Sequence, residues 1–188
     1  IALLFICLYP AAQDFWSKKV ALIIAGLPLF VPGWLAFFVL RNQSNHEFHI
    51  LLLFFLVAAA DIGAYFAGRT FGKYKLAVRV SPNKTWEGFV GGVLACTLLL
   101  VITALIFSEQ LPEMDLMRWF KLVIMGLVIA AFSVVGDLFE SMVKRNRDVK
   151  DSGTILPGHG GILDRIDGLT AAAPVYALCL IQLGPEFL

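Results

Sequence analysis

Long apolar runs separated by short polar stretches dominate the chain. A helix needs about 20 apolar residues to cross about 30 Å of hydrocarbon, because it rises about 1.5 Å per residue. The runs that meet or approach this length are 20–40, 50–68, 89–107, 122–140 and the shorter 169–183, and 1–9 resembles the end of an earlier span. The pattern predicts an all-α fold, a polytopic bundle of transmembrane helices forming a single membrane-embedded domain over residues 1–188.

Composition agrees with this pattern. The chain is 59% hydrophobic and only 15% charged, with a mean hydropathy of +0.81, whereas soluble domains carry about 25% charged residues. The net charge of +1 provides no basic field for nucleic acid, which we therefore do not expect as a partner. The chain opens within an apolar run and without methionine, so we expect it to be the N-terminally incomplete part of a longer polypeptide.

Basic residues concentrate in three of the segments between spans. Segments 10–19, 69–85 and 141–167 hold two, five and five of the 15 lysines and arginines, and the other three are Arg41, Arg118 and Lys121. Short cytoplasmic loops carry the excess of basic residues in membrane proteins. We therefore expect an integral protein of a bacterial inner membrane, with these three loops in the cytoplasm and the C-terminus outside. Pro28 and Pro32 should kink the first full span.

Two aspartates lie within apolar spans. An unpaired carboxylate there costs about 2.5 to 3.5 kcal/mol even on the lenient insertion scale, so each should face the bundle interior. Asp137, Glu140, Ser141 and Lys144 follow helical spacing and form a polar stripe that descends from the loop into the membrane. Asp61 is isolated, and either an interhelical hydrogen bond or a functional role would explain it.

The loop after this stripe combines glycines, carboxylates and basic side chains. Its sequence "PGHGGILDRIDG" cannot sustain a helix through Pro157, Gly158, Gly160 and Gly161, and glycines let backbone N–H groups approach a phosphate. Asp164 and Asp167 then follow three residues apart. Carboxylates beside lysines and arginines suit a magnesium-bridged polyphosphate, while the spacings of an EF-hand and of a Walker A loop are both absent. The alternative is a solvated connecting loop.

A second loop, "RVSPNKTWEGFVGG" at 79–92, places polar donors just before a helix expected to begin near Trp86. Donors at a helix N-terminus can bind an anion, but on this loop alone ordinary helix entry is favoured, with Thr85 as N-cap. Gly88 and Gly92 have the spacing of helix-packing glycines. That packing could be internal or could join two subunits in a homodimer.

Residues 141–167, "SMVKRNRDVKDSGTILPGHGGILDRID", resemble the signature of the phosphatidate cytidylyltransferase family. The pattern S-x-x-K-R, four residues, K-D-x-G, then L-P-x-H-G-G-x-x-D-R-x-D is matched without a gap. The upstream "ADIGAYFAGRTFGK" and "SPNKTWEGFVGG" also resemble this family, so the resemblance covers about residues 58–173. It implies a nucleotidyltransferase reaction in which CTP and phosphatidic acid give CDP-diacylglycerol and pyrophosphate for phospholipid synthesis.

The resemblance also implies roles for individual residues. Asp137 and Asp164 would be ligands of Mg²⁺, with room for a second cation, and Asp151 and Asp167 would be auxiliary carboxylates. The basic side chains would neutralise phosphate oxygens: Lys144, Arg145, Lys150 and Arg165. His159 would donate to a phosphate. The expected substrate contacts are Ser81, Asn83, Lys84, Ser141, Gly160 and Gly161.

Two other functions fit parts of the pattern. A CTP-dependent polyprenol or phytol kinase would use a similar site but would transfer the γ-phosphoryl group and release CDP. A transporter would use intramembrane aspartates and broken helices as ligands near the bilayer midplane. The concentration of charge at one face, and the lack of a detectable inverted repeat, favour the enzyme over the transporter.

Overall fold

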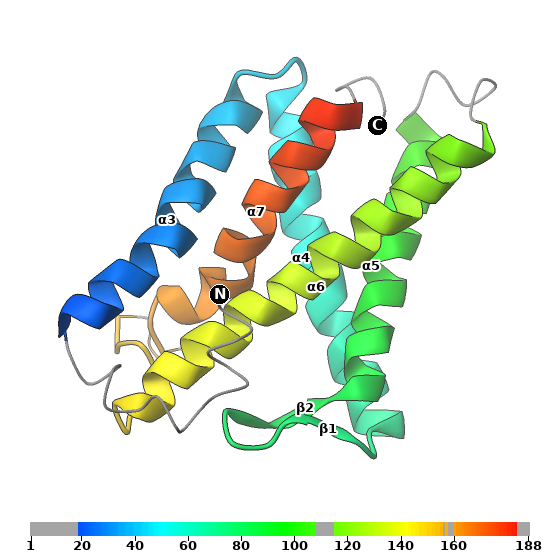
Figure 1. Cartoon of the computed structure of the whole chain (residues 1–188). Coiled ribbons are helices and arrows are strands. Elements are labelled where there is room, and N and C mark those ends of the chain that lie inside the picture. The colour runs from blue at the N-terminus through cyan, green and yellow to red at the C-terminus, as the bar shows by residue number, and fades with distance from the viewer. Residues whose placement is uncertain (1–18, 108–114, 156, 158–159, 184–188) are drawn as a thin grey trace.

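The computed structural model describes residues 19–107, 115–155, 157 and 160–183. Within these ranges the chain forms five helices and one short β-hairpin (Figure 1). The helices are α3 (Lys19–Arg41), α4 (His46–Phe71), α5 (Trp86–Phe107), α6 (Leu116–Asn146) and α7 (Leu163–Leu183). The predicted all-α bundle is confirmed, and the expected span at 1–9 lies outside the described residues.

The helices have the length and surface of a membrane protein. Four of them, α4 to α7, are long and apolar enough to cross a bilayer, and the described apolar part of α3, Gly26–Arg41, is shorter. Large apolar side chains are exposed along the helices, including Trp34, Phe55 and Leu94, as lipid contact requires. This is an integral membrane protein. Helix α3 continues through Pro28 and Pro32, and the expected kink stays a prediction.

Glycine and alanine let α4 and α5 pack closely together. A Cβ atom at Gly92 would lie 2.7 Å from the Ala60 carbonyl oxygen, and one at Gly88 would lie 2.8 Å from the Ala64 carbonyl oxygen. Since both glycines face α4 of the same chain, this pair belongs to an internal helix contact. Thr85 caps α5 as expected, with its Oγ1 accepting from the Gly88 N–H at 3.1 Å.

Helices α6 and α7 are the most buried of the four long apolar helices, and they also meet through small residues. A Cβ atom at Gly136 would lie 2.5 Å from the Asp167 carbonyl oxygen. A Cβ atom at Gly168 would lie 2.6 Å from Ser133 Oγ. Because Gly136 and Gly168 directly adjoin Asp137 and Asp167, the close packing places these two carboxylates at one helix crossing.

The segment between α4 and α5 is a β-hairpin. Strands β1 (Lys75–Ala77) and β2 (Ser81–Thr85) are antiparallel, with Lys75 opposite Thr85 and Ala77 opposite Ser81. Val80 is buried in a cluster with three residues of α6, Leu138, Phe139 and Met142. The Arg145 Nε also donates to the Val80 carbonyl oxygen at 3.4 Å. The hairpin is therefore docked on the last turns of α6 (Figure 1).

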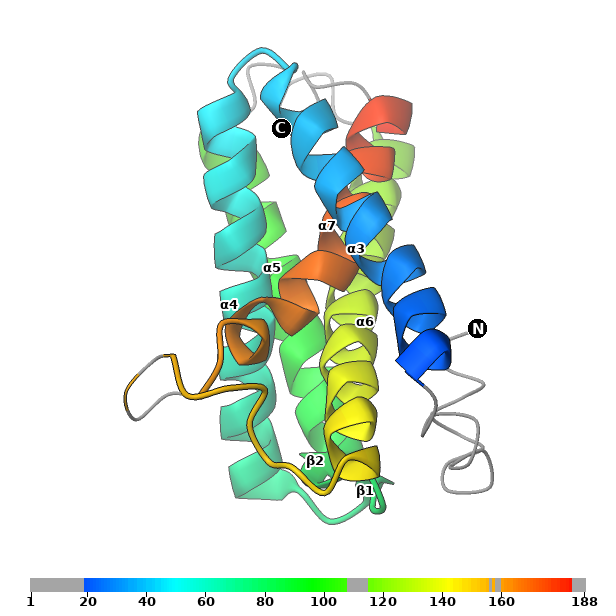
Figure 2. The ribbon, with the colours of Figure 1, turned by 90° about the vertical axis from the view of Figure 1, so that its left-hand side faces the viewer.

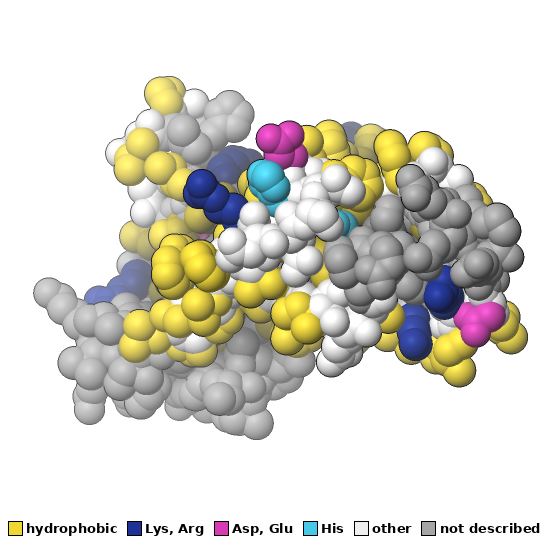
Figure 3. Space-filling view, turned by 90° about the horizontal axis from the view of Figure 1, so that it is seen from above, with side chains coloured by type: hydrophobic (Ala, Val, Ile, Leu, Met, Phe, Trp, Pro, Cys, Tyr) yellow, Lys and Arg dark blue, Asp and Glu magenta, His cyan; other side chains and the backbone are white. Residues whose placement is uncertain are grey.

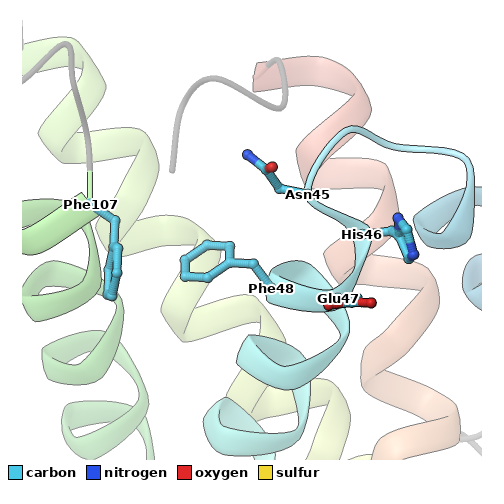
Figure 4. Close-up of a pocket in the computed structure, with 5 residues that line it drawn as sticks. All are labelled: Asn45, His46, Glu47, Phe48 and Phe107. Carbon is cyan, nitrogen blue, oxygen red and sulfur yellow. The ribbon is translucent and has the colours of Figure 1, made fainter.

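The other end of the bundle holds the turn between α3 and α4. A cavity of 490 Å³ there is lined by Asn45, His46, Glu47, Phe48 and Phe107 (Figure 4). Figure 3 looks onto this end, where lysine and arginine side chains are scattered among hydrophobic ones. Below this surface the buried His49 Nδ1 lies 3.2 Å from the buried Tyr176 hydroxyl, which links α4 to α7.

Candidate active site

The predicted site residues gather at the hairpin end of the bundle, where the loop between α6 and α7 passes (Figure 2). Lys84 of β2 reaches across to α6, and its Nζ lies 2.5 Å from Asp137 Oδ2. The other oxygen, Asp137 Oδ1, accepts from Ser141 Oγ at 3.2 Å. This last contact confirms that the polar stripe of α6 lies on one helix face. The packing of the hairpin against α6 thus places Lys84 next to Asp137.

Asp164 organises the loop that precedes α7. Its Oδ2 accepts from Gly161 N at 2.7 Å, Ser152 N at 2.9 Å and Ser152 Oγ at 3.0 Å. Its Oδ1 accepts from Lys144 Nζ at 2.6 Å. Gly160 has a φ of 81°, a conformation that glycine adopts without strain. One carboxylate therefore connects the loop, the first turn of α7 and the polar stripe of α6.

A second group of carboxylates surrounds Lys144. Glu140 is buried, and its Oε2 accepts from Lys144 Nζ at 3.2 Å. The Glu140 carboxyl also contacts that of Asp167, whose Oδ1 accepts from the Gly168 N–H at 2.7 Å. Two adjacent carboxylates repel each other unless a proton or a cation stands between them. The α6·α7 crossing therefore concentrates negative charge, which Lys144 and Lys84 offset.

A pocket of 580 Å³ lies between α4, α5, α6 and the hairpin. Its polar lining includes Asp61, Arg69, Ser81, Asn83, Lys84 and Asp137, and its apolar lining includes Leu76, Phe89 and Val134. Asp61 faces this pocket, and its carboxyl interacts electrostatically with those of Asp137 and Asp167 and with the Lys84 ammonium. The pocket is thus lined both by the two aspartates of the apolar spans, Asp61 and Asp137, and by residues of the loop 79–92.

The remaining predicted residues lie around this centre. Lys150 and Asp151 are exposed on the loop, and Arg165 is exposed on the first turn of α7. Arg145 is engaged with the hairpin backbone rather than with the pocket lining. His159 lies outside the described residues. The structure thus brings together Ser81, Asn83, Lys84 and Asp137 in the pocket, and Lys144, Gly161 and Asp164 beside it.

The pocket lining contains two polar side chains, Tyr65 and Arg69, that are not among the predicted site residues. Tyr65 and Arg69 follow Asp61 at intervals of four residues, so the three share one face of α4 that lines the pocket. The periodicity was available in the sequence. In the sequence, Arg69 is one of five basic residues in a segment that indicates membrane orientation, and Tyr65 lies within an apolar span.

The donor set accommodates magnesium. The described residues contain no group of three or more His, Cys, Asp or Glu side chains that could hold a metal, but magnesium bound to phosphates needs only one or two carboxylates. A carboxylate oxygen has about two lone-pair sites. Asp164 Oδ1 and both oxygens of Asp137 each have one contact to a neighbouring side chain. Each therefore retains acceptor capacity for a cation.

Comparison with known proteins gives consistent matches. The sequence model of the cytidylyltransferase family matches residues 1–183. The phosphatidate cytidylyltransferase of Haemophilus influenzae is 44% identical over 189 residues, covering 94% of this chain and 63% of the relative. That of Pseudomonas aeruginosa is 40% identical over 185 residues, covering 98% and 66%. That of Staphylococcus haemolyticus is 43% identical over 151 residues, covering 80% and 55%. The chain thus spans less than two thirds of the length of these curated relatives.

Proposed function

This chain belongs to the cytidylyltransferase family, and on that premise we propose that it carries the site of a phosphatidate cytidylyltransferase. The enzyme would transfer the cytidylyl group of CTP to phosphatidic acid, giving CDP-diacylglycerol and pyrophosphate. The observation that carries the proposal is the Lys84–Asp137 ion pair in a pocket that the candidate membrane spans α4, α5 and α6 line together with the hairpin. This arrangement suits a substrate that is part nucleotide and part lipid.

In the proposed reaction an oxygen of the phosphatidate phosphate attacks the α-phosphorus of CTP. A new phosphorus–oxygen bond forms, the bond to the β-phosphate breaks, and its electron pair leaves on pyrophosphate. A phosphate monoester is already anionic at neutral pH, so no general base is needed. The protein would contribute position and positive charge, through Lys84 in the pocket and Lys144 beside the loop.

Magnesium is proposed as the cofactor, with Asp137 and Asp164 as the residues that would hold it. When bound, it would neutralise negative charge on the phosphates. A second cation is proposed beside Glu140 and Asp167, because a proton or a cation would relieve the repulsion between their two carboxyls. Asp151, Lys150, Arg145, Arg165 and His159 stay as proposed contributors around the triphosphate, with Ser81, Asn83, Ser141 and Gly160 as proposed substrate contacts.

The site is proposed to face the cytoplasm of a bacterium. The hairpin end carries most of the described basic residues, including Arg69, Lys84 and Lys144, and the opposite end carries Arg41, Arg118 and Lys121. Cytoplasmic loops carry such an excess. A homodimer would need a surface other than the Gly88–Gly92 face, because that face is occupied by α4.

The test is pyrophosphate release by the purified protein in detergent with CTP, phosphatidic acid and magnesium, beside controls that omit each component. Release that requires all three, with an equal yield of CDP-diacylglycerol, supports the proposal. Formation of CDP from a polyprenol or phytol would support a kinase instead. Magnesium-dependent CTP binding without any turnover, together with solute flux in proteoliposomes, would favour a transporter.

A further inference from the structure

Arg69 is held in place at the rim of the pocket by its own helix. It lies in the last turn of α4, and its Nη1 donates to the Tyr65 hydroxyl at 2.7 Å. Its guanidinium carbon also lies 5.9 Å from the centre of the Tyr65 ring, in cation–π contact. Both side chains line the pocket, and both are exposed. Tyr65 thus fixes the direction of the guanidinium and leaves most of its donors available.

The charge of Arg69 is not neutralised by the protein. Within the described ranges, Lys84 and Lys144 form the ion pairs of this region, and Arg69 forms none. Lys84, the other cation of the pocket lining, is already paired with Asp137. An arginine offers five N–H donors in a planar fork that matches two oxygens of one phosphate. The pocket therefore presents an unsatisfied anion-binding group at its rim.

The position of this group favours a lipid phosphate. Asp61, Tyr65 and Arg69 form a stripe about 12 Å long on α4, from within the span to its charged end. An arginine at the end of a span places its head at the level of lipid headgroups. Part of the pocket lining is apolar, with Leu76, Phe89 and Val134, and can contact the glycerol and upper acyl carbons of a lipid.

We propose that Arg69, oriented by Tyr65, binds the phosphate of the lipid substrate at the rim of this pocket and makes the enzyme selective for a phosphate monoester lipid over uncharged diacylglycerol. This inference rests on the proposed function. It assigns the lipid and the nucleotide to different cations, with Arg69 taking the lipid phosphate. Lys84, Lys144 and the loop beside them are left to the triphosphate.

The experiment measures steady-state kinetics in mixed micelles, varying CTP and the mole fraction of phosphatidic acid separately. Arg69→Gln should raise the KM for phosphatidic acid about 10- to 100-fold, the range expected for losing a charged hydrogen bond. The KM for CTP should stay within about twofold of its original value. Arg69→Lys should recover part of the loss. Arg79→Gln is the matched control, since it removes one positive charge from the same hairpin end without touching the pocket.

Tyr65→Phe provides a second variant that keeps the ring and removes the hydroxyl. We expect a KM for phosphatidic acid raised about threefold, and no further effect when Tyr65→Phe is added to Arg69→Gln, because the two side chains act as a unit. An unchanged KM for phosphatidic acid in Arg69→Gln would overturn the proposal. So would an equal rise in the KM for CTP, which would assign Arg69 to the nucleotide.

A binding measurement separates this inference from the proposed function. Native mass spectrometry would compare dipalmitoyl phosphatidic acid with dipalmitoyl glycerol on the original protein and on Arg69→Gln. Preference for the phosphatidic acid that is lost in Arg69→Gln supports the site even if the original protein makes no CDP-diacylglycerol. Turnover by the original protein with no such preference would leave the enzyme assignment standing and would refute the role of Arg69.

Discussion

Lys84 Nζ and Asp137 Oδ2 lie 2.5 Å apart, although one belongs to a β-hairpin and the other to a transmembrane helix. Two features of the hairpin make this contact. Val80 is buried against α6, and Arg145 binds the Val80 carbonyl oxygen from the end of the same helix. Lys84 is therefore positioned by the packing of the hairpin against α6.

Replacing Lys84 should reduce turnover strongly. Lys84→Gln removes one of the two positive charges of the pocket lining and leaves Asp137 without its ion-pair partner. We therefore expect a loss of about 100- to 1000-fold in kcat/KM, comparable to removing one charge-stabilising donor. Lys84→Arg should retain more activity than Lys84→Gln. Lys75→Gln, on the other strand and outside the pocket lining, is the control. Activity of Lys84→Gln equal to that control would remove Lys84 from the site.

Replacing Asp164 should release the loop as well as abolish turnover. Asp164→Ala deletes the acceptor of Ser152, Gly161 and Lys144, and we expect trypsin to cleave after Arg147 and Lys150 much faster than in the original protein. Loss of such hydrogen bonds costs about 1 kcal/mol each, more for the charged one.

Asp148→Asn is the control for this loop. Asp148 has a φ of 53°, and asparagine tolerates that conformation. A cleavage rate in Asp164→Ala no higher than in this control would show that the loop is held by other contacts.

Gly136→Ala should destabilise the α6·α7 crossing. The added Cβ would lie 2.5 Å from the Asp167 carbonyl oxygen, so the two helices must separate, and overpacking of this kind costs about 1 to 3 kcal/mol. We expect a lower melting temperature in detergent together with reduced activity, because Asp137 and Asp167 adjoin the contact. At Gly153 an added Cβ would meet its nearest atom at 3.7 Å, so Gly153→Ala should leave the melting temperature unchanged.

Tyr176→Phe should lower stability without lowering activity at permissive temperature. The hydroxyl lies 3.2 Å from His49 Nδ1, both residues are buried, and neither lines the pocket beside the hairpin. Interhelical hydrogen bonds in membranes average about 0.6 kcal/mol, with a maximum of about 1.7. A double-mutant cycle with His49→Leu should show coupling of this size. Additive effects of the two changes would mean that the contact contributes nothing.

The helices and the polar stripe of α6 could be predicted from the sequence. The apolar runs have a length that only membrane spans need. The spacing from Asp137 to Lys144 places the polar side chains of this segment on one face of a helix. Helix α6 nevertheless continues to Asn146, beyond the expected 122–140, because its last turns are charged and no longer look like a span. Periodicity marks the buried core of a helix better than its ends.

The hairpin and its contacts were not predictable from local pattern. The two strands within residues 75–85 are short. The second contains Pro82, which is tolerated in a two-stranded hairpin but weakens the sequence signal of a strand. The contact of Lys84 with Asp137 joins residues far apart in the chain. The hydrogen bonds of Asp164 to Ser152 and Gly161 similarly depend on how a glycine-rich loop turns. Such contacts are set by tertiary packing, which no sequence period encodes.

The acidic and basic lining of the pocket has a consequence for the surrounding bilayer. Asp61 lies about 15 Å along α4 from the C-terminal end of this helix. Ionised groups at that depth draw in water and thin the membrane locally. Lipids beside α4 and α6 would therefore sit in a shallow hydrated depression. In that depression a headgroup can descend towards Asp137 while its acyl chains stay in the leaflet. The protein would thus lower the aqueous interface to the level of its site.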